Sequence, residues 1–319
     1  IINRDGIKIA IIGMITPAIP NWLNESLWKG MHFDGMVKSA RYWMEVVKKK
    51  EHPQVIIGLF HSGRNKGILT KEYQENASLE VAEKVPGFDL VLYGHDHTRH
   101  IDRITNVKGD NVLCLDPSCD AYLVGDAQIH LQMDGDNILS KQVTGQLKDV
   151  SNEKVSEEYM ANFKAHYDSV DKFVNRKIGT FENTISTRDS YFGNSAFMDF
   201  IHYLQLQISG AQISFAAPLT FDTQINKGDV YISDMFNLYK YENQIYVVKM
   251  SGKEIKGFLE MSYDLWTNTM TSPNDHIMLL SSTKNDKQRN GFKNLAFNFD
   301  SASGINYTVD VTKPNGKKI

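Results

Sequence analysis

This chain of 319 residues has few cysteines and lacks long apolar runs. It has only two cysteines, Cys114 and Cys119, which are too few for a disulfide framework. We interpret them as small hydrophobic side chains in the interior rather than as a bond or a ligand pair. No apolar run approaches the roughly 20 residues that a membrane-spanning helix needs. We therefore expect no membrane span.

The chain also has no large excess of positive or negative charge. The formal net charge is -3, and the longest basic run, Lys48-Lys49-Lys50, falls at the end of a predicted helix. Proteins that bind nucleic-acid polymers neutralise many phosphates with lysine and arginine, so we expect no such partner. No pattern in the sequence implies a protein partner. The composition is that of an ordinary globular protein, and the length indicates two domains.

What the first hundred residues do contain is an alternation of apolar strands and amphipathic helices. Apolar runs at 7–14, 55–60 and 89–93 predict strands of the kind that is covered on both faces in a parallel sheet. Apolar side chains recur at helical spacing in 34–50, and a second helix is expected at 76–85. This βαβαβ order predicts a layered α/β domain.

The pattern then changes to antiparallel strands at 112–115, 121–133 and 137–148, the last two joined by the turn Asp134-Gly135-Asp136. The polar segment 151–177, with apolar residues at helical intervals, predicts a long helix that links two domains. The predicted division is therefore a domain over 1–150, a linker helix over 151–177 and a second domain over 178–319.

The second half has its own elements. A helical pattern covers 194–209, a strand is expected at 213–218, and Ser251 with Glu254 has the spacing of a capping box that begins another helix. The remaining expectations are strands over 245–250, 294–299 and 305–311, and loops over 63–70 and 267–292. The fold class is α/β.

Histidines follow two of the predicted parallel strands. His61 comes directly after the strand at 55–60, and His95 and His97 follow the strand at 89–93. Open α/β sheets place their ligands at the carboxyl edge, where these strand ends meet. A single histidine is more often a surface or core residue, but three at one edge predict a site for Zn, Mn, Fe or Co. A two-metal site also needs bridging carboxylates, and Asp96 alternates away from its two neighbours.

These motifs resemble a known family. Phe60-His61-Ser62-Gly63 followed by Gly94-His95-Asp96-His97-Thr98 resembles the later motifs of calcineurin-like metallophosphoesterases, a lone histidine and then Gly-His-x-His. Residues 6–17 resemble the strand after the Gly-Asn-His motif of nucleotidase members. The second half resembles the 5′-nucleotidase C-terminal domain, and 213–219 and 239–243 are most similar to the 2′,3′-cyclic-nucleotide 2′-phosphodiesterase/3′-nucleotidase branch.

The resemblance implies the C-terminal part of a four-layer α/β/β/α metallophosphoesterase domain, followed by an α/β 5′-nucleotidase C-terminal domain. It implies two divalent metal ions, with His61 and His95 on one and His97 on the other. Tyr241 falls where the family places an aromatic ring that stacks on the nucleobase, a contact worth ~1–3 kcal/mol. Without the family, Tyr241 is equally well a core or interface residue. Further positions that match the family near the same pocket are Asn243, Asn194 and Phe215.

Other family motifs do not occur in the chain. Asp-x-His, the bridging aspartate and Gly-Asn-His with the catalytic histidine are missing, and the chain begins Ile1-Ile2-Asn3 without a signal sequence. We expect these motifs upstream of Ile1 and a second stacking aromatic beyond Ile319. No catalytic residue is therefore assigned here, and the chain alone is expected to be inactive. From the family, the complete protein is expected in the periplasm or at the cell surface.

The implied function is metal-dependent hydrolysis of nucleoside 2′,3′-cyclic phosphates and 3′-monophosphates, with the nucleotide as partner. Ala217-Pro218-Leu219 stands where 5′-nucleotidases carry Gly-Gly-x-Arg, so a 5′-nucleotidase or UDP-sugar hydrolase is the alternative. An alternative of another class is a nucleotide-binding module that kept the fold and lost the chemistry. A metallo-β-lactamase-like hydrolase needs His-x-His-x-Asp-His, which is absent.

Overall fold

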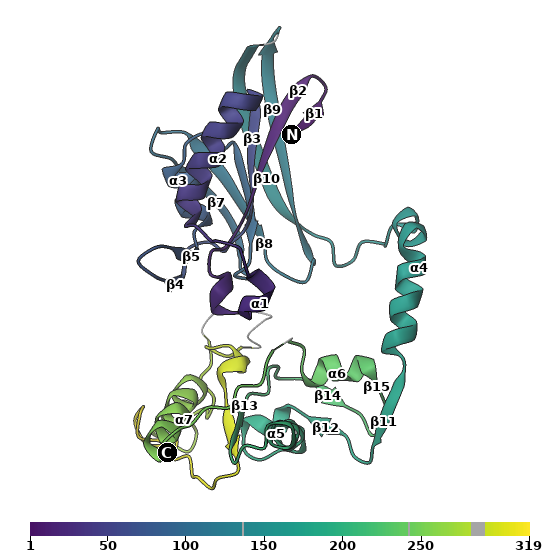
Figure 1. The fold of residues 1–319 in the computed structure, drawn as a ribbon, viewed down its shortest axis with the longest axis vertical. Coiled ribbons are helices and arrows are strands. Elements are labelled where there is room, and N and C mark those ends of the chain that lie inside the picture. Colours follow the sequence, from purple (N-terminus) through teal and green to yellow (C-terminus); the bar gives the residue numbers. More distant parts are fainter. Residues whose placement is uncertain (136, 242, 282–290) are drawn as a thin grey trace. The chain divides into compact units, whose positions relative to one another are not determined.

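The computed structural model of the protein describes residues 1–135, 137–241, 243–281 and 291–319 (Figure 1). These ranges leave out Asp136 of the predicted turn, Glu242 of the 239–243 motif, and 282–290 of the predicted loop. The chain separates into two compact units, Ile1–Val155 and Ser156–Ile319. Both mix helices and strands, which confirms the α/β class. None of the helices in the described ranges is long and apolar enough to cross a membrane.

A six-stranded sheet in the order β1-β2-β3-β6-β8-β7 organises the first unit. Its centre is parallel: β2 pairs with β3 and β3 with β6, as the apolar runs predicted. The strand β8, which we predicted in an antiparallel layer, pairs parallel with β6 and antiparallel only with β7. The edges β1 and β7 are antiparallel. The strand β7 was not predicted, because its side chains alternate between exposed and half-buried and form no apolar run. The strands are β1 (Ile2–Arg4), β2 (Ile7–Ile15), β3 (Val55–His61), β6 (Leu90–Gly94), β7 (Arg99–Thr105) and β8 (Asn111–Pro117).

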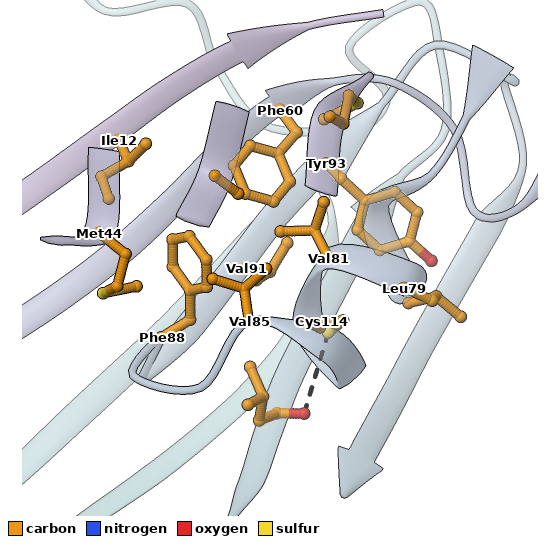
Figure 2. Close-up of a cluster of buried hydrophobic side chains, with 14 of the residues drawn as sticks. Ile12, Met44, Phe60, Leu79, Val81, Val85, Phe88, Val91, Tyr93 and Cys114 are labelled. Atoms are coloured by element: carbon orange, nitrogen blue, oxygen red, sulfur yellow. Dashed lines mark hydrogen bonds between the residues drawn. The ribbon is translucent and has the colours of Figure 1, made fainter. Parts of the chain in front are cut away.

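Helices cover one face of this sheet. Successive strand residues point to opposite faces, so Ile56 and Phe60 of β3 face α2 (Met36–Glu51) and α3 (Ser78–Lys84) in one apolar core. Figure 2 shows this core, in which the rings of Phe60 and Phe88 meet edge to face with centroids 5.6 Å apart. Both predicted helices of the βαβαβ unit are therefore confirmed, each within two residues at either end.

A hairpin covers the other face. The strands β9 (Leu123–Asp134) and β10 (Asn137–Asp149) pair over their whole length. Ile57 of β3 and Leu113 and Leu115 of β8 point toward them and form a second core. A Cβ on Gly145 would lie 2.9 Å from the Leu113 side chain, so glycine allows the hairpin to approach the sheet closely. The first unit is therefore a helix layer, a sheet and a hairpin.

The segment between β3 and α3 is not the loop that we predicted. It holds a short antiparallel hairpin of β4 (Lys66–Leu69) and β5 (Gln74–Asn76). Two such short, mostly polar strands leave no periodicity to read in the sequence. Ahead of α2, the chain makes a 3₁₀ turn, η1 (Ile19–Asn21), and a short helix, α1 (Glu25–Trp28), that begins at the cap residue Asn24.

The second unit packs helices against short strand pairs. Its helix α7 begins with the predicted capping box, since Ser251 Oγ accepts from the Glu254 amide and Glu254 accepts from the Ser251 amide at 2.7 Å. Its largest core is aromatic, with the Trp266 and Phe299 rings stacked at 5.8 Å. The helices are α4 (Glu157–Val174), α5 (Ala196–Ser209), α6 (Ile232–Leu238) and α7 (Gly252–Trp266), with 3₁₀ turns η2 (Arg188–Tyr191) and η3 (Ala296–Asn298). The strand pairs are β11 (Lys177–Phe181) with β15 (Gly228–Tyr231), β12 (Ile185–Ser186) with β14 (Gln224–Ile225), and β13 (Ser214–Ala216) with β16 (Ser301–Ser303).

Three strand predictions in this unit were wrong. Residues 245–250 and 305–311 are not in strands, and 294–299 contains η3 instead. The run Ile245–Val248 has strong β propensity, but propensity describes fit to a pleated surface and cannot supply a partner strand. Here Tyr246, Val247 and Val248 are exposed.

The cysteine interpretation is confirmed for one residue of two. Both thiols are free; Cys114 is fully buried in the helix-side core, whereas Cys119 is partly exposed beyond the end of β8.

The helix-side core makes a stability prediction. Phe60→Ala should lower the free energy of unfolding by ~3–5 kcal/mol, because it removes a buried ring between sheet and helices. Leu59→Ala is the matched control, since Leu59 is 52% exposed on the opposite face of the same strand; it should cost about 1 kcal/mol or less. Urea unfolding followed by tryptophan fluorescence reports on this unit, which holds Trp22, Trp28 and Trp43 of the four tryptophans. Equal losses in the two variants would contradict this packing.

Candidate metal centre

The parallel register brings the strand ends to one level. His61, the last residue of β3, is paired with Ile15 of β2 on one side and with Gly94 of β6 on the other. The chain leaves β6 at Gly94 and turns at once, which places His95 beside His61. Their rings lie 5.0 Å apart between centroids, and His95 Nδ1 is 3.3 Å from His61 Nε2. The structure therefore brings two of the three predicted histidines into contact.

His97 lies two residues further along the same turn. Its side chain is exposed. Burial and the charges of His95 and His97 together lower the pKa of His61. A lowered pKa keeps imidazole neutral near pH 7, and the neutral ring is the form that coordinates metals.

The turn that carries His95 and His97 is strained. Their φ angles are +113° and +57°, in the left-handed region that residues with a Cβ seldom adopt. Asp96, between them, holds the turn: its carboxylate accepts from the Arg64 amide at 2.6 Å and from the Thr98 hydroxyl at 2.7 Å. Asp96 thus points away from the histidines, as its alternation predicted, and ties the turn to the segment after β3.

A buried carboxyl lies behind this turn. Asp116 of β8 has no exposed surface, and its side chain is hydrogen-bonded to that of Asp96. Burial first, and then the neighbouring Asp96, raise the pKa of Asp116 to about 8. The raised pKa favours the protonated form of Asp116, in which it can donate to Asp96. Ser118, two residues on, donates from its hydroxyl to the His97 carbonyl at 3.0 Å.

Sequence reasoning missed a carboxylate at this edge. Glu75 of β5 has Oε1 2.9 Å from His95 Nε2, on the side of the ring away from His61. The Trp22 ring lies 5.3 Å from the His95 ring between centroids. Glu75 falls between the two histidine motifs in the sequence, but only the unpredicted β4–β5 hairpin brings it to them. The signal that could have identified Glu75 in the sequence was the presence of a carboxylate between the two histidine motifs.

We tested whether a divalent ion fits these residues. Two imidazole nitrogens 3.3 Å apart, each ~2.1 Å from one ion, would subtend an angle of about 105°, between octahedral and tetrahedral values. The pair therefore fits as two ligands of one ion. No group of three or more His, Cys, Asp and Glu side chains within the described ranges is placed to hold a metal. These residues supply part of a coordination shell.

The predicted substrate residues lie in the second unit. Tyr241, Asn243 and Phe215 line one cavity of about 670 Å³ between α5 and residues 244–250. Asn243 donates to the Tyr239 hydroxyl at 2.9 Å, and the Lys240 ammonium lies 5.2 Å from the centre of the Tyr241 ring.

Asn194 is not in that cavity. It lines a second one of about 580 Å³, together with Tyr191 and His202. The structure therefore gathers three of the four predicted substrate residues and separates the fourth from them. The buried His202 ring is held by Ser214 at 2.9 Å and Ser301 at 3.2 Å.

Comparison with known protein families gives a match for the second unit. Residues 177–319 match the family described as 5′-nucleotidase, C-terminal domain. The match covers most of the second unit and less than half of the whole chain. The cavity with Tyr241 and the one with Asn194 both lie within the matched residues. The strained histidine turn lies outside the matched range, in the unit before it.

Curated relatives match both units. The trifunctional nucleotide phosphoesterase protein YfkN of Bacillus subtilis is 25% identical over 99% of this chain and 23% of its own length. The 2′,3′-cyclic-nucleotide 2′-phosphodiesterase/3′-nucleotidase of Salmonella typhimurium is 23% identical over 98% of this chain and 53% of its own length. The chain therefore spans about half, or less, of the length of these relatives.

Solved structures share the fold along nearly the whole chain. A protein of Staphylococcus aureus assigned as a 5′-nucleotidase superposes on 99% of the chain with a TM-score of 0.72 and 21% identity, over 60% of its own length. A 5′-nucleotidase precursor of Thermus thermophilus gives a TM-score of 0.58 at 18% identity, again over 99% of the chain and 58% of its own length. At these identities the likeness concerns the fold alone.

The buried carboxyl pair predicts a pH dependence of stability. Since its pKa is raised, Asp116 contributes stability below the unfolded pKa near 4 and loses it as the pH rises toward about 8, by at most about 1.4 kcal/mol per pH unit. Asp116→Asn keeps a donor toward Asp96 and cannot ionise, so it should remove this slope. Urea unfolding at pH 5 and pH 8 measures it: the variant should gain stability relative to the wild type at the higher pH.

Asp134→Asn, at the exposed end of β9, is the control for that experiment. It should leave the difference between the two pH values unchanged. If the wild type and Asp116→Asn instead show parallel pH curves, Asp116 does not hold a proton in the folded state.

Proposed function

We propose that this chain is part of a metal-dependent nucleotide phosphoesterase, of the kind that hydrolyses nucleoside 2′,3′-cyclic phosphates and 3′-monophosphates. The observation that carries the proposal is the pair of imidazole nitrogens facing each other at 3.3 Å on the carboxyl edge of a parallel sheet. The nucleotidase domain that follows, and relatives named as nucleotide phosphoesterases along nearly the whole chain, support the nucleotide as substrate.

In the proposed mechanism each unit has one task. His61 and His95 would hold one divalent ion, and His97 would belong to a second. When bound, such ions activate water and withdraw charge from a phosphoryl group. Tyr241 would stack on the base, which suits any nucleobase because each has a π-face. Asn243, held by the Tyr239 hydroxyl, would offer its remaining amide groups to the edge of the base.

The preference for cyclic and 3′-phosphates depends on one segment. Ala217-Pro218-Leu219 follows β13 without an arginine, and Ala217 is buried. A 5′-nucleotidase of the Gly-Gly-x-Arg type would use a guanidinium here to pair with phosphate. This absence favours the cyclic-nucleotide branch over a 5′-nucleotidase or UDP-sugar hydrolase.

Metal binding tests the histidine assignment. His61→Ala and His95→Ala should each weaken Mn²⁺ binding to the complete protein, measured by calorimetry, by at least about 100-fold, because a lost ligand costs more than the 10–100-fold typical of outer partners. His97→Ala should remove or weaken a second binding event. His52→Ala, beyond the end of α2, is the control. Unchanged Mn²⁺ affinity in His61→Ala and His95→Ala would end the proposal.

Substrate choice is tested on the complete protein. Phosphate release from 2′,3′-cyclic AMP, 3′-AMP and 5′-AMP should be fastest for the first two and should stop when EDTA removes the metal. A strong preference for 5′-AMP would favour the 5′-nucleotidase alternative. Binding of these nucleotides without hydrolysis would favour the non-catalytic module.

The stacking role makes a separate prediction. Tyr241→Ala should weaken nucleotide binding by about 5- to 150-fold, the equivalent of ~1–3 kcal/mol, whereas Tyr241→Phe should bind nearly as the wild type. Tyr203→Ala is the control, because Tyr203 is exposed on α5 and does not line the cavity. Titration with a fluorescent nucleotide measures the affinities. Wild-type affinity in Tyr241→Ala would remove this residue from the site.

A further inference from the structure

We propose that Glu75 is a positioning residue that fixes the tautomer of His95, so that Nδ1 presents its lone pair on the side where His61 lies. The inference rests on the metal site proposed above and adds to it a residue that belongs to none of the sequence motifs. It concerns a second contact of the ligand ring rather than a ligand.

The two nitrogens of His95 have different neighbours. Glu75 Oε1 lies 2.9 Å from Nε2, and His61 Nε2 lies 3.3 Å from Nδ1. A carboxylate only accepts hydrogen bonds, so Nε2 carries the ring proton and donates it to Glu75. The lone pair of neutral His95 is then on Nδ1. Without a cation, His61 can donate its Nε2 proton to that lone pair; to share a cation with His95, neutral His61 would instead carry its proton on Nδ1 and leave the Nε2 lone pair for the cation.

Glu75 is itself held in place. Its second oxygen, Oε2, accepts from the Ile68 amide at 2.7 Å across the β4–β5 hairpin, and its side chain is only 15% exposed. A Cβ on Gly67, which has φ +74°, would fall 2.5 Å from Oε2. A larger residue at this position would be strained at this φ and would push the carboxylate from its place.

The backbone of Glu75 ties the hairpin to the sheet edge. Its carbonyl accepts from the Thr16 hydroxyl at 2.9 Å and from the Ser62 hydroxyl at 2.8 Å. Both donors directly follow strands of the parallel sheet, β2 and β3. The carboxylate is thus fixed relative to the same strand ends that place His61.

These contacts favour positioning over two other roles. As a ligand, Glu75 would need a free oxygen near the histidine pair, but Oε1 faces the far nitrogen of His95 and Oε2 is used by Ile68. If Glu75 only formed a structural ion pair with His95, the contact would not require one particular tautomer of the His95 ring. The orientation of a ligand imidazole by a carboxylate on its other nitrogen is a general device of metal sites.

The glutamine variant separates these roles. In Glu75→Gln, the amide cannot accept from both His95 and the Ile68 amide. If its oxygen stays on Ile68, its NH₂ group meets His95 Nε2 and drives the ring proton to Nδ1, where it blocks the metal position. Glu75→Ala removes the preference altogether. Glu72→Gln, an exposed residue of the same hairpin loop, is the matched control.

The first measurement needs no metal. In metal-free chain with ¹⁵N-labelled histidine, at about pH 8 where imidazole is neutral, long-range ¹H–¹⁵N spectra report which nitrogen of each ring is protonated. We expect His95 as the Nε2–H tautomer in the wild type and in Glu72→Gln, and a shift toward Nδ1–H in Glu75→Gln. Wild-type His95 in the Nδ1–H form would overturn the proposal even if every variant failed to fold. Tryptophan fluorescence, which reports mainly on the first unit, shows whether each variant is folded.

The second measurement is Mn²⁺ affinity. Glu75→Gln and Glu75→Ala should each bind Mn²⁺ about 10–100-fold more weakly than the wild type, and Glu72→Gln should not. If Glu75→Gln keeps both the wild-type tautomer of His95 and the wild-type Mn²⁺ affinity, the role of Glu75 is only structural. If the complete wild-type protein binds no Mn²⁺ while the His95 tautomer is as expected and moves in Glu75→Gln, the proposed function fails and the tautomer assignment stands.

Discussion

The parallel pairing of β3 with β6 is the constraint on which the site depends. It sets His61 opposite Gly94, so the lone histidine and the His-x-His turn begin at the same height of the sheet. Because side chains alternate along a strand, a register shift of one residue would send His61 to the helix side. Burial on both faces prevents such a shift: Phe60 is fixed by the helix-side core and Ile57 by the hairpin-side core.

Placing the histidines in the turn after β6 requires backbone strain. His95 and His97, on either side of Asp96, adopt left-handed backbone angles, each unfavourable by of order 1–3 kcal/mol for a residue with a Cβ. The surrounding hydrogen bonds offset that strain: Asp96 accepts from the Arg64 amide and from the Thr98 hydroxyl, and the Ser118 hydroxyl donates to the His97 carbonyl. The polar network behind the site therefore supports the turn that carries His95 and His97.

Elements with a regular apolar pattern could be predicted from the sequence. Features that depend on single long-range contacts could not. Continuous apolar runs gave the parallel strands, and the strand ends then placed His61 beside His95. Glu75 was missed because its contact with His95 spans 20 positions and depends on a hairpin too short to show a pattern. The strand expected at 245–250 was wrong for a related reason: propensity favours an extended chain but does not specify a partner. The nucleotidase domain was foreseen from motif resemblance rather than from pattern.

In the proposed chemistry, the two ends of a nucleotide are recognised by different interactions. A phosphoester is recognised through charge and needs ligands held to within a few tenths of an ångström, which a doubly covered parallel sheet provides. A base is recognised by stacking on a face, which tolerates larger displacement and suits a cavity lined by Tyr241 and residues of a segment outside regular structure. Positional precision therefore matters most where His95 is held from both sides, by Glu75 at Nε2 and by the Asp96 turn along its backbone.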